Sequence, residues 1–241
     1  MADQIIAGRK VVLEYLSTVE GDATLYIAES AHGRILDVIV GKASSRNIPV
    51  NKVPKSWFDS HCQPHHQGVA LMMSYRPHNT TQNRFYLPDI ASSQGVIVAC
   101  DGITDPHNIG SIIRTAEALG GNAIIVTKAH APEITQTIIK ASAGATAHII
   151  VHHVANLASF IEDAKQSGFW IIGTSDRGTH PIQSIRQYKP AVLIIGSEGS
   201  GMRHRTQQLC DITVAIPLRG KVSSLNASVA AGIVLWELLK E

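Results

Sequence analysis

Long hydrophobic runs, aromatic residues and charged residues are all scarce in this chain. Of its 241 residues, 5% are aromatic and 17% are charged. No apolar run approaches the roughly 18 residues that cross a bilayer, and the first ten residues lack the apolar core of an export signal. We therefore expect a cytoplasmic protein with no membrane partner. The apolar content of 44% predicts a globular fold with a sizeable core.

Cysteine is scarce as well. Cys62, Cys100 and Cys210 lie far apart and form no C-x-x-C pair, which predicts buried thiols rather than disulfides. The stretch 61–66 (HCQPHH) contains metal-ligand residue types, but its nearest counterpart is the adjacent pair at 152–153, whose spacing fits no common metal site. We interpret 61–66 as an ordinary polar loop and predict no metal.

Neither sign of charge is in strong excess. The chain has 21 basic and 19 acidic residues, divided as nine against eight up to residue 93 and twelve against eleven beyond it. No basic tail and no aromatic-rich platform indicates a nucleic acid, and nothing indicates DNA. An RNA partner must therefore bind through a local basic patch. The candidate residues for such a patch are Arg9, Lys10, Arg203, Arg205, Arg219 and Lys221.

The pattern along the chain predicts two α/β domains joined by a linker. Residues 1–76 contain short alternating apolar and amphipathic segments, typical of a small α/β module. Residues 77–93 are rich in Pro, Asn, Thr, Gln and Ser and read as the linker. Between 94 and 241, continuous apolar runs alternate with helical patterns, which predicts a parallel sheet covered on both faces.

Three polar loops follow three of these apolar runs, at 101–108, 197–202 and 217–226. The carboxyl ends of strands in an open α/β sheet form the usual ligand site, so we expect the loops to converge. No phosphate-binding G-x-x-x-x-G-K-[ST] is present, and the glycines of 196–201 stand in the wrong order for a dinucleotide fingerprint. A G-x-S-x-G elbow is also missing. A dinucleotide-binding enzyme and a hydrolase are therefore weak alternatives.

The three loops and their flanks carry a more specific resemblance. The segments DGITDPHNIGSIIRTAEALG, IIGSEGSGM and IPLRGKVSSLNASVAAGIVLWE resemble, in order and spacing, the three motifs of SpoU-type (TrmH family) RNA ribose 2'-O-methyltransferases of the SPOUT superfamily. The first domain, ending in HQGVAL at 66–71, resembles the ribosomal L30e/L7Ae RNA-binding fold. The resemblance covers essentially the whole chain. It is strongest for enzymes that methylate a guanosine of bacterial large-subunit (23S) ribosomal RNA.

The resemblance implies an α/β fold with a C-terminal trefoil knot, which pattern reasoning does not predict because true knots are nearly absent from proteins. It also implies that S-adenosyl-L-methionine binds within the knot, largely through backbone groups. Glycine allows positive φ or close backbone approach, and the apolar members of the set offer walls for adenine. The implied cofactor-binding residues are Gly196, Glu198, Gly199, Gly201, Ile216, Leu218, Ser224 and Leu225.

For catalysis, the resemblance implies a central role for Arg114. Arginine is normally protonated, so we expect it to orient the ribose hydroxyl and the phosphate and to stabilise negative charge. Asn108 is expected at the start of the same helix, as its cap or as a substrate ligand, and Glu198 is a candidate ion-pair partner of Arg114. Ser224 and Asn226 are expected to bind ribose or the methionine end of the cofactor, or to cap the helix that follows.

The family resemblance also implies a homodimer. The predicted helix 227–239 is apolar over more than one face, which suits packing on its own sheet and on a partner. Two alternatives to a 23S ribosomal RNA enzyme stay open. One is a family member that acts on transfer RNA or on another ribosomal position, and the other is a non-catalytic RNA-binding protein of ribosome assembly. Loss of Arg114, Glu198 or Asn226 would favour the non-catalytic alternative, and all three are present.

Overall fold

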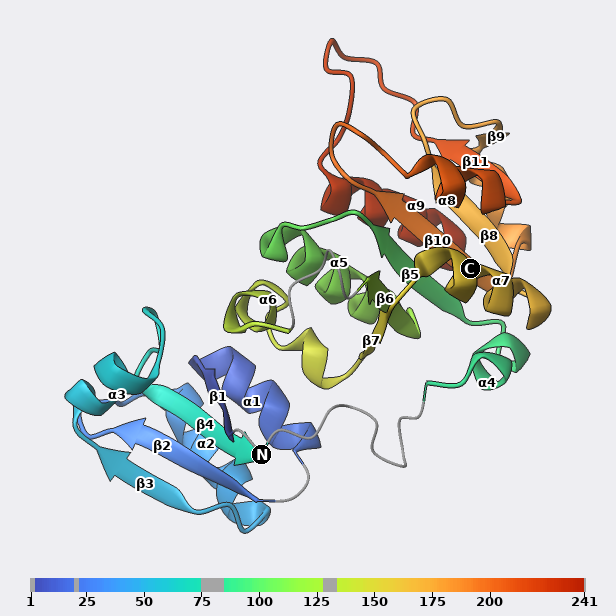
Figure 1. Cartoon of the computed structure of the whole chain (residues 1–241). Coiled ribbons are helices and arrows are strands. Elements are labelled where there is room, and N and C mark those ends of the chain that lie inside the picture. Colours follow the sequence, from blue (N-terminus) through green and yellow to red (C-terminus); the bar gives the residue numbers. More distant parts are fainter. Residues whose placement is uncertain (1–2, 20–21, 75–84, 128–133, 241) are drawn as a thin grey trace.

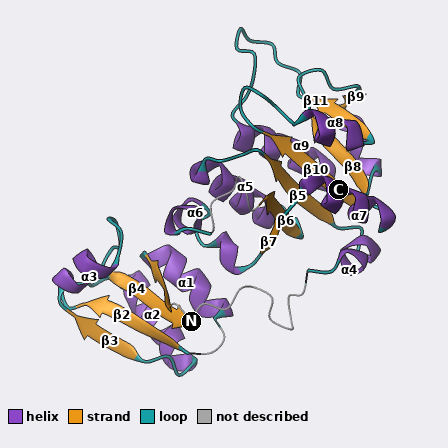
Figure 2. Ribbon diagram, viewed as in Figure 1, coloured by secondary structure: helices purple, strands orange, loops and turns teal. Residues whose placement is uncertain are grey.

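The computed structural model describes residues 3–19, 22–74, 85–127 and 134–240 (Figure 1). They form two sheets, each with its own helices (Figure 2). The chain begins with the smaller α/β unit, whose elements are β1 (Asp3–Ala7), α1 (Arg9–Thr18), β2 (Ala23–Ala28), α2 (Arg34–Ser45), β3 (Val50–Val53), α3 (Lys55–His61) and β4 (Val69–Ser74).

The small sheet has the strand order β1-β4-β2-β3. Strand β4 is antiparallel to β1 and β2, whereas β2 and β3 are parallel. Helices α1 and α2 cover one face, because their apolar residues recur on a single side and join Leu25 and Ile27 in the core. The other face is covered by the short helix α3, whose fully buried Phe58 packs over Ala7, Ala28 and Ala70. Small residues at those three strand positions leave room for the ring.

The larger unit follows the predicted alternation of strands and helices. Its elements are α4 (Leu87–Ser92), β5 (Val96–Asp101), α5 (Pro106–Ala118), β6 (Ala123–Thr127), α6 (Gln136–Ala141), η1 (Ala145–Ala147), β7 (Ile150–Val154), α7 (Leu157–Gln166), β8 (Trp170–Thr174), β9 (His180–Pro181), η2 (Ile182–Gln187), β10 (Ala191–Gly196), α8 (His204–Leu209), β11 (Ile212–Ala215) and α9 (Ala227–Leu239).

These seven strands form a parallel sheet with the order β7-β6-β5-β10-β8-β11-β9. Every residue of β5 and β6 is buried, because one core lies between the sheet and α5, α9 and η2, and a second lies beneath α4 and α7. The predicted parallel sheet is confirmed. None of the described helices is long and apolar enough to cross a membrane.

The linker expected over 77–93 contains ordered structure. Residues 77–84 lie outside the described part of the chain. The remainder includes α4, which places Ile90 in the core beneath the large sheet. Pro88 stands in the first turn of this helix, where a proline is compatible with helical geometry, so the composition that suggested a linker also suits a helix start.

The two units are in direct contact through α1 and the segment 136–148. The hydroxyl of Tyr15 lies 2.9 Å from Oγ1 of Thr146 in a buried pair, and His148 Nε2 lies 3.0 Å from Glu14 Oε2. Ile139 of α6 is buried in the core of the small unit. The small unit is thus packed against the side of the large one that carries α6, as Figure 1 shows.

Candidate active site

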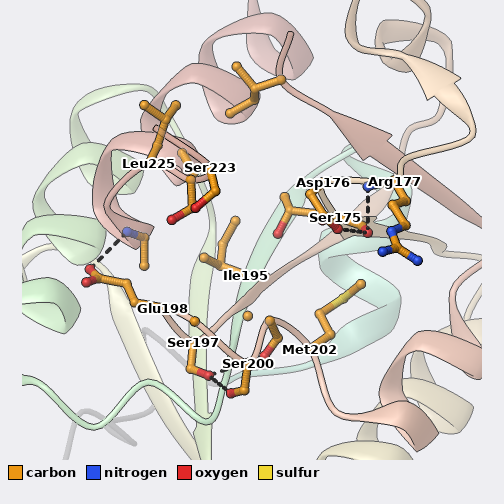
Figure 3. A pocket seen from close by; sticks show the side chains of 18 of the residues that line it. Ser175, Asp176, Arg177, Ile195, Ser197, Glu198, Ser200, Met202, Ser223 and Leu225 are labelled. Atoms are coloured by element: carbon orange, nitrogen blue, oxygen red, sulfur yellow. Dashed lines mark hydrogen bonds between the residues drawn. The ribbon is translucent and has the colours of Figure 1, made fainter. Parts of the chain in front are cut away.

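The three polar loops meet at one edge of the large sheet. Strand β10 pairs with β5 along its whole length, which brings Gly196 opposite Asp101 and places the following loops side by side. The loop after β11 and the start of α9 complete a cavity of about 570 Å³ (Figure 3). All eight residues expected to bind the cofactor line it: Gly196, Glu198, Gly199, Gly201, Ile216, Leu218, Ser224 and Leu225.

The Gly-rich loop 197–201 is a tight, closed turn. Ser197 and Gly201 exchange two backbone hydrogen bonds of 3.1 and 3.0 Å, and the hydroxyls of Ser197 and Ser200 lie 2.5 Å apart (Figure 3). Gly199 and Gly201 have φ of +86° and +67°. A Cβ on Gly196 would lie 2.3 Å from the carbonyl carbon of Gly201, so only glycine fits at the base of this turn.

Glu198 joins all three loops through hydrogen bonds. Its Oε1 accepts from Asn108 Nδ2 at 2.9 Å, from Asn226 Nδ2 at 2.6 Å and from the backbone N–H of Ala227 at 3.2 Å. Asn226 Nδ2 also donates to Asn108 Oδ1 at 2.9 Å. The carboxylate lies at the positive N-terminus of α9, where negative charge is favoured. These contacts fix the relative positions of the three motif segments.

We expected Arg114 to form an ion pair with Glu198, but the two side chains do not pair. Arg114 lies exposed on α5, and the described residues include no ion-pair partner for it. The carboxylate oxygen that we assigned to it is occupied by Asn108 and Asn226. The guanidinium therefore remains available to bind a ligand.

Asn108 and Asn226 differ in whether they cap a helix. We expected a helix that begins near Ile109, with Asn108 as its cap or as a substrate ligand. The cap is instead Asp105, which accepts from the N–H of His107, and α5 begins at Pro106. Asn108 thus lies in the first turn of the helix, where its amide donates to Glu198. Asn226 does cap α9, because its Oδ1 accepts from two N–H groups while its Nδ2 bonds Glu198 and Asn108.

A further buried acid, Asp101, lies at the end of β5 and was not among the expected site residues. Its side chain is fully buried, and Oδ2 accepts from the backbone N–H of Arg203 at 2.7 Å. Its Oδ1 lies 3.7 Å from Arg203 Nε and has no hydrogen-bond partner. Asp101 thereby ties the end of β5 to the end of the Gly-rich loop. A single acid at the end of an apolar run is the signal that was overlooked.

The loop after β8 also lines the cavity and was not predicted. Ser175, Asp176 and Arg177 face it from the side opposite Glu198 (Figure 3). The turn is held by a hydrogen bond from the N–H of Arg177 to Ser175 Oγ at 3.1 Å. The polar residues after the apolar run 170–173 were its sequence signal.

Of the three predicted buried thiols, one is fully buried. Cys100 is buried, whereas Cys62 and Cys210 are half-buried. Burial raises the pKa of both Cys100 and Cys210 to about 12, so neither thiol is a nucleophile at neutral pH. Within the described residues, no cluster of three or more His, Cys, Asp or Glu side chains is arranged to hold a metal ion.

Comparison with known proteins shows the family to which the chain is similar. Residues 95–236 match the SpoU rRNA Methylase family, and residues 5–77 match the family of RNA 2'-O ribose methyltransferase substrate-binding domains. A Staphylococcus aureus protein named as a TrmH family tRNA/rRNA methyltransferase is 35% identical over 100% of this chain and 97% of its own. A Bacillus subtilis protein with the same family name, YacO, is 33% identical over 98% and 95%.

Solved structures agree in fold. The SpoU methyltransferase AviRb from Streptomyces viridochromogenes has a TM-score of 0.81 at 22% identity, over 99% of this chain and 89% of its own. An rRNA methyltransferase from Sinorhizobium meliloti, solved with AdoMet bound, has a TM-score of 0.76 at 25% identity, over 98% and 86%.

A substrate-binding domain followed by a catalytic domain with three converging loops defines a class, the two-domain RNA methyltransferases. Both the family matches and the full-length relatives point to one family within this class. The chain belongs to the SpoU (TrmH) family of RNA methyltransferases.

Proposed function

We propose that this chain transfers the methyl group of S-adenosylmethionine to the 2'-hydroxyl of a ribose in RNA, and that its target is a guanosine of 23S ribosomal RNA, as in the RlmB enzymes. The observation that carries the proposal is that Glu198, which lines the cavity with residues of the second and third motif segments, also accepts a hydrogen bond from Asn108 of the first. The named relatives are tRNA/rRNA methyltransferases, so transfer RNA is the second candidate substrate.

The cavity suits S-adenosylmethionine in size and lining. Its volume of about 570 Å³ lies within the usual range for cofactor sites, roughly 300–1,000 Å³. Ile195, Ile216, Leu218 and Leu225 offer apolar walls for an adenine ring. The glycines of the loop 196–201 leave backbone groups open to a ligand, since nothing lies within 4 Å of a Cβ placed on Gly199 or Gly201.

When bound, S-adenosylmethionine supplies an electrophilic methyl group on a sulfonium. The 2'-oxygen would form the new C–O bond as the S–CH₃ bond breaks. The electron pair of that bond would stay on sulfur as a neutral thioether, and the hydroxyl proton would pass to water. In this scheme Arg114 orients the ribose and the neighbouring phosphate and stabilises the negative charge that develops on oxygen. Asn108 and Asn226, held by Glu198, fix the edge of the site at which the ribose enters. Ser224, which is exposed on the cavity wall, binds the ribose or the methionine end of the cofactor.

The proposal includes a homodimer and the family's trefoil knot. Helix α9 exposes an apolar stripe at positions i, i+4 and i+7, with Val229 49%, Ile233 39% and Trp236 58% exposed. Gly232 of α9 lies against Thr115, so this stripe runs beside α5, the helix of Arg114. A second copy seated on the stripe would therefore stand next to the catalytic arginine. The loop 216–226 and α9 are the segment that would pass through the knot.

Incubation of the purified chain with tritiated S-adenosylmethionine and undermethylated total RNA tests the proposal. Methyl incorporation into large-subunit RNA is the expected result. Incorporation into transfer RNA alone would retain the reaction and overturn the proposed substrate. No incorporation, together with no cofactor binding in a calorimetric titration, would favour a non-catalytic RNA-binding protein.

A further inference from the structure

The small unit carries a column of stacked aromatic rings that its composition does not suggest. Tyr26 of β2 and Trp57 of α3 stack at 4.3 Å between centroids and 12° between planes, and Trp57 stacks on His61 at 4.4 Å and 13°. His61 is exposed at the end of α3, and its Nδ1 lies 2.8 Å from the carbonyl of Trp57 and 3.0 Å from Ser60 Oγ. The ring is held flat against the column by these contacts, and among the described residues no ring covers its second face.

The loop that follows His61 is held in an unusual backbone conformation. His65 and Gln67 have φ of +70° and +58°, values that non-glycine residues rarely adopt. His66 stacks on Phe58 at 4.8 Å, and Arg9 bonds Gln67 twice, through its N–H to Oε1 at 3.0 Å and through Nε to the carbonyl at 3.2 Å. Strained backbone of this kind persists only where surrounding contacts hold it, and it concentrates at binding sites.

This loop is linked to the catalytic helix. Lys140 of α6 donates to the carbonyl of Pro64 at 2.9 Å, and in Figure 1 the loop between α3 and β4 rises on the side of the small unit that faces α6. Helix α6 packs directly on α5, where a Cβ on Gly110 would lie 2.4 Å from the Cβ of Ala141. Helix α6 therefore contacts both this loop and α5, the helix that carries Arg114.

One exposed basic side chain, Lys55, stands two residues before Trp57 on α3. Lys55 forms no ion pair with a residue that the structure describes. Lys52 is also exposed, but it pairs with Ile27 and so belongs to the face of the sheet opposite Tyr26. The exposed acid on α3, Asp59, lies 3.8 Å from His66 Nε2. An unpaired nucleotide is bound by two kinds of group: a flat ring, on which its base stacks, and a cation, which contacts its phosphate.

We propose that the exposed face of His61, at the end of the Tyr26–Trp57–His61 column, stacks on an unpaired base of the substrate RNA. Lys55 contacts a flanking phosphate. The small unit thereby selects RNA that presents an unpaired nucleotide at a fixed distance from the target ribose. This inference rests on the proposed function, because it takes the domain that matches the substrate-binding family to bind RNA.

The test measures binding of the full chain to two fluorescein-labelled RNAs by anisotropy: a hairpin with an unpaired loop and a fully paired duplex of the same stem. Stacking of a base on an aromatic side chain contributes about 1–3 kcal/mol, so His61→Ala is expected to raise the Kd for the hairpin roughly fivefold or more. His61→Phe keeps a flat ring and is expected to stay within about twofold of the unaltered chain. Neither variant should change binding of the duplex.

His180→Ala is the matched control, because His180 also touches the hydroxyl of the preceding residue and an aromatic ring but lies on β9 at the far edge of the large sheet. Circular dichroism melting checks that each variant folds. Equal hairpin affinities for His61→Ala and His180→Ala would overturn the inference, as would a loss in His61→Phe equal to that in His61→Ala.

The methylation assay separates this inference from the proposed function. Methyl incorporation by the unaltered chain with no effect of His61→Ala on hairpin binding would leave the function and remove the stacking site. A hairpin-specific loss without any methyl incorporation would leave the stacking site and remove the function.

Discussion

Asp101→Asn tests whether the buried acid holds the Gly-rich loop in place. The replacement has nearly the same shape, and its oxygen can keep the hydrogen bond from the N–H of Arg203. Its amide nitrogen then occupies the position of Oδ1, which is buried and faces Arg203 Nε at 3.7 Å. The variant therefore places a donor against a donor in a site that water does not reach.

The expected cost follows from that unsatisfied group. A buried donor without an acceptor costs about 1–3 kcal/mol of the free energy of unfolding. The middle of this range, about 2 kcal/mol, corresponds to a fall of about 4–8 °C in melting temperature for a chain of this size. Because Arg203 directly follows the loop that lines the cavity, we also expect weaker binding of S-adenosylmethionine.

Circular dichroism melting and calorimetric titration with S-adenosylmethionine measure the two effects. Asp163→Asn is the control, since Asp163 is exposed on α7 and its side chain has no hydrogen bond to a described residue. A melting temperature for Asp101→Asn within 1 °C of that control, with unchanged cofactor affinity, would refute the reasoning.

Three further predictions concern the site and the thiols. Arg114→Ala is expected to lower the rate of methyl transfer at least about 100-fold while leaving the melting temperature unchanged, because the exposed arginine has no ion-pair partner among the described residues; substantial residual turnover would remove it from the central role. Gly201→Val is expected to weaken cofactor binding in a titration more than Gly201→Ala does. Both variants strain the backbone at φ +67°, but only valine adds bulk. Equal cofactor affinities of the two variants would show that this glycine is not part of the cofactor wall. Raised pKa values of about 12 keep Cys100 and Cys210 protonated, so iodoacetamide at pH 8 should label Cys62 first in the native chain. Peptide mass spectrometry measures the labelling of each cysteine. Faster labelling of Cys100 would contradict its burial.

Much of the fold could be predicted because local patterns carry it. The apolar runs at 95–100, 123–126, 170–173 and 192–196 correspond to β5, β6, β8 and β10. The amphipathic segments at 8–16 and 35–43 correspond to α1 and α2. The strands β1 and β3 and the helix α3 were missed, since each has at most seven residues and no clear periodicity. Short elements depend on their neighbours for stability more than on their own sequence.

The candidate site was predicted as a set of loops but not as a set of contacts. Glu198 was expected to pair with Arg114. Instead its oxygen accepts from Asn108, 90 residues before it, and from Asn226, 28 residues after it. The aromatic column could not be predicted from the sequence either. Tyr26 and Trp57 are distant along the chain, and only the packing of α3 on the sheet brings them together. Side-chain pairing over such separations is set by tertiary structure, which a single sequence does not display.

The most direct test of the account is the position of the methyl group on the RNA. RNA methylated by the purified chain is digested to nucleosides and analysed by mass spectrometry, and a second sample is hydrolysed in alkali. The account predicts 2'-O-methylguanosine and one alkali-resistant dinucleotide, because a methylated 2'-oxygen cannot attack the adjacent phosphodiester. A methyl group on a base, with every phosphodiester cleaved by alkali, would contradict it.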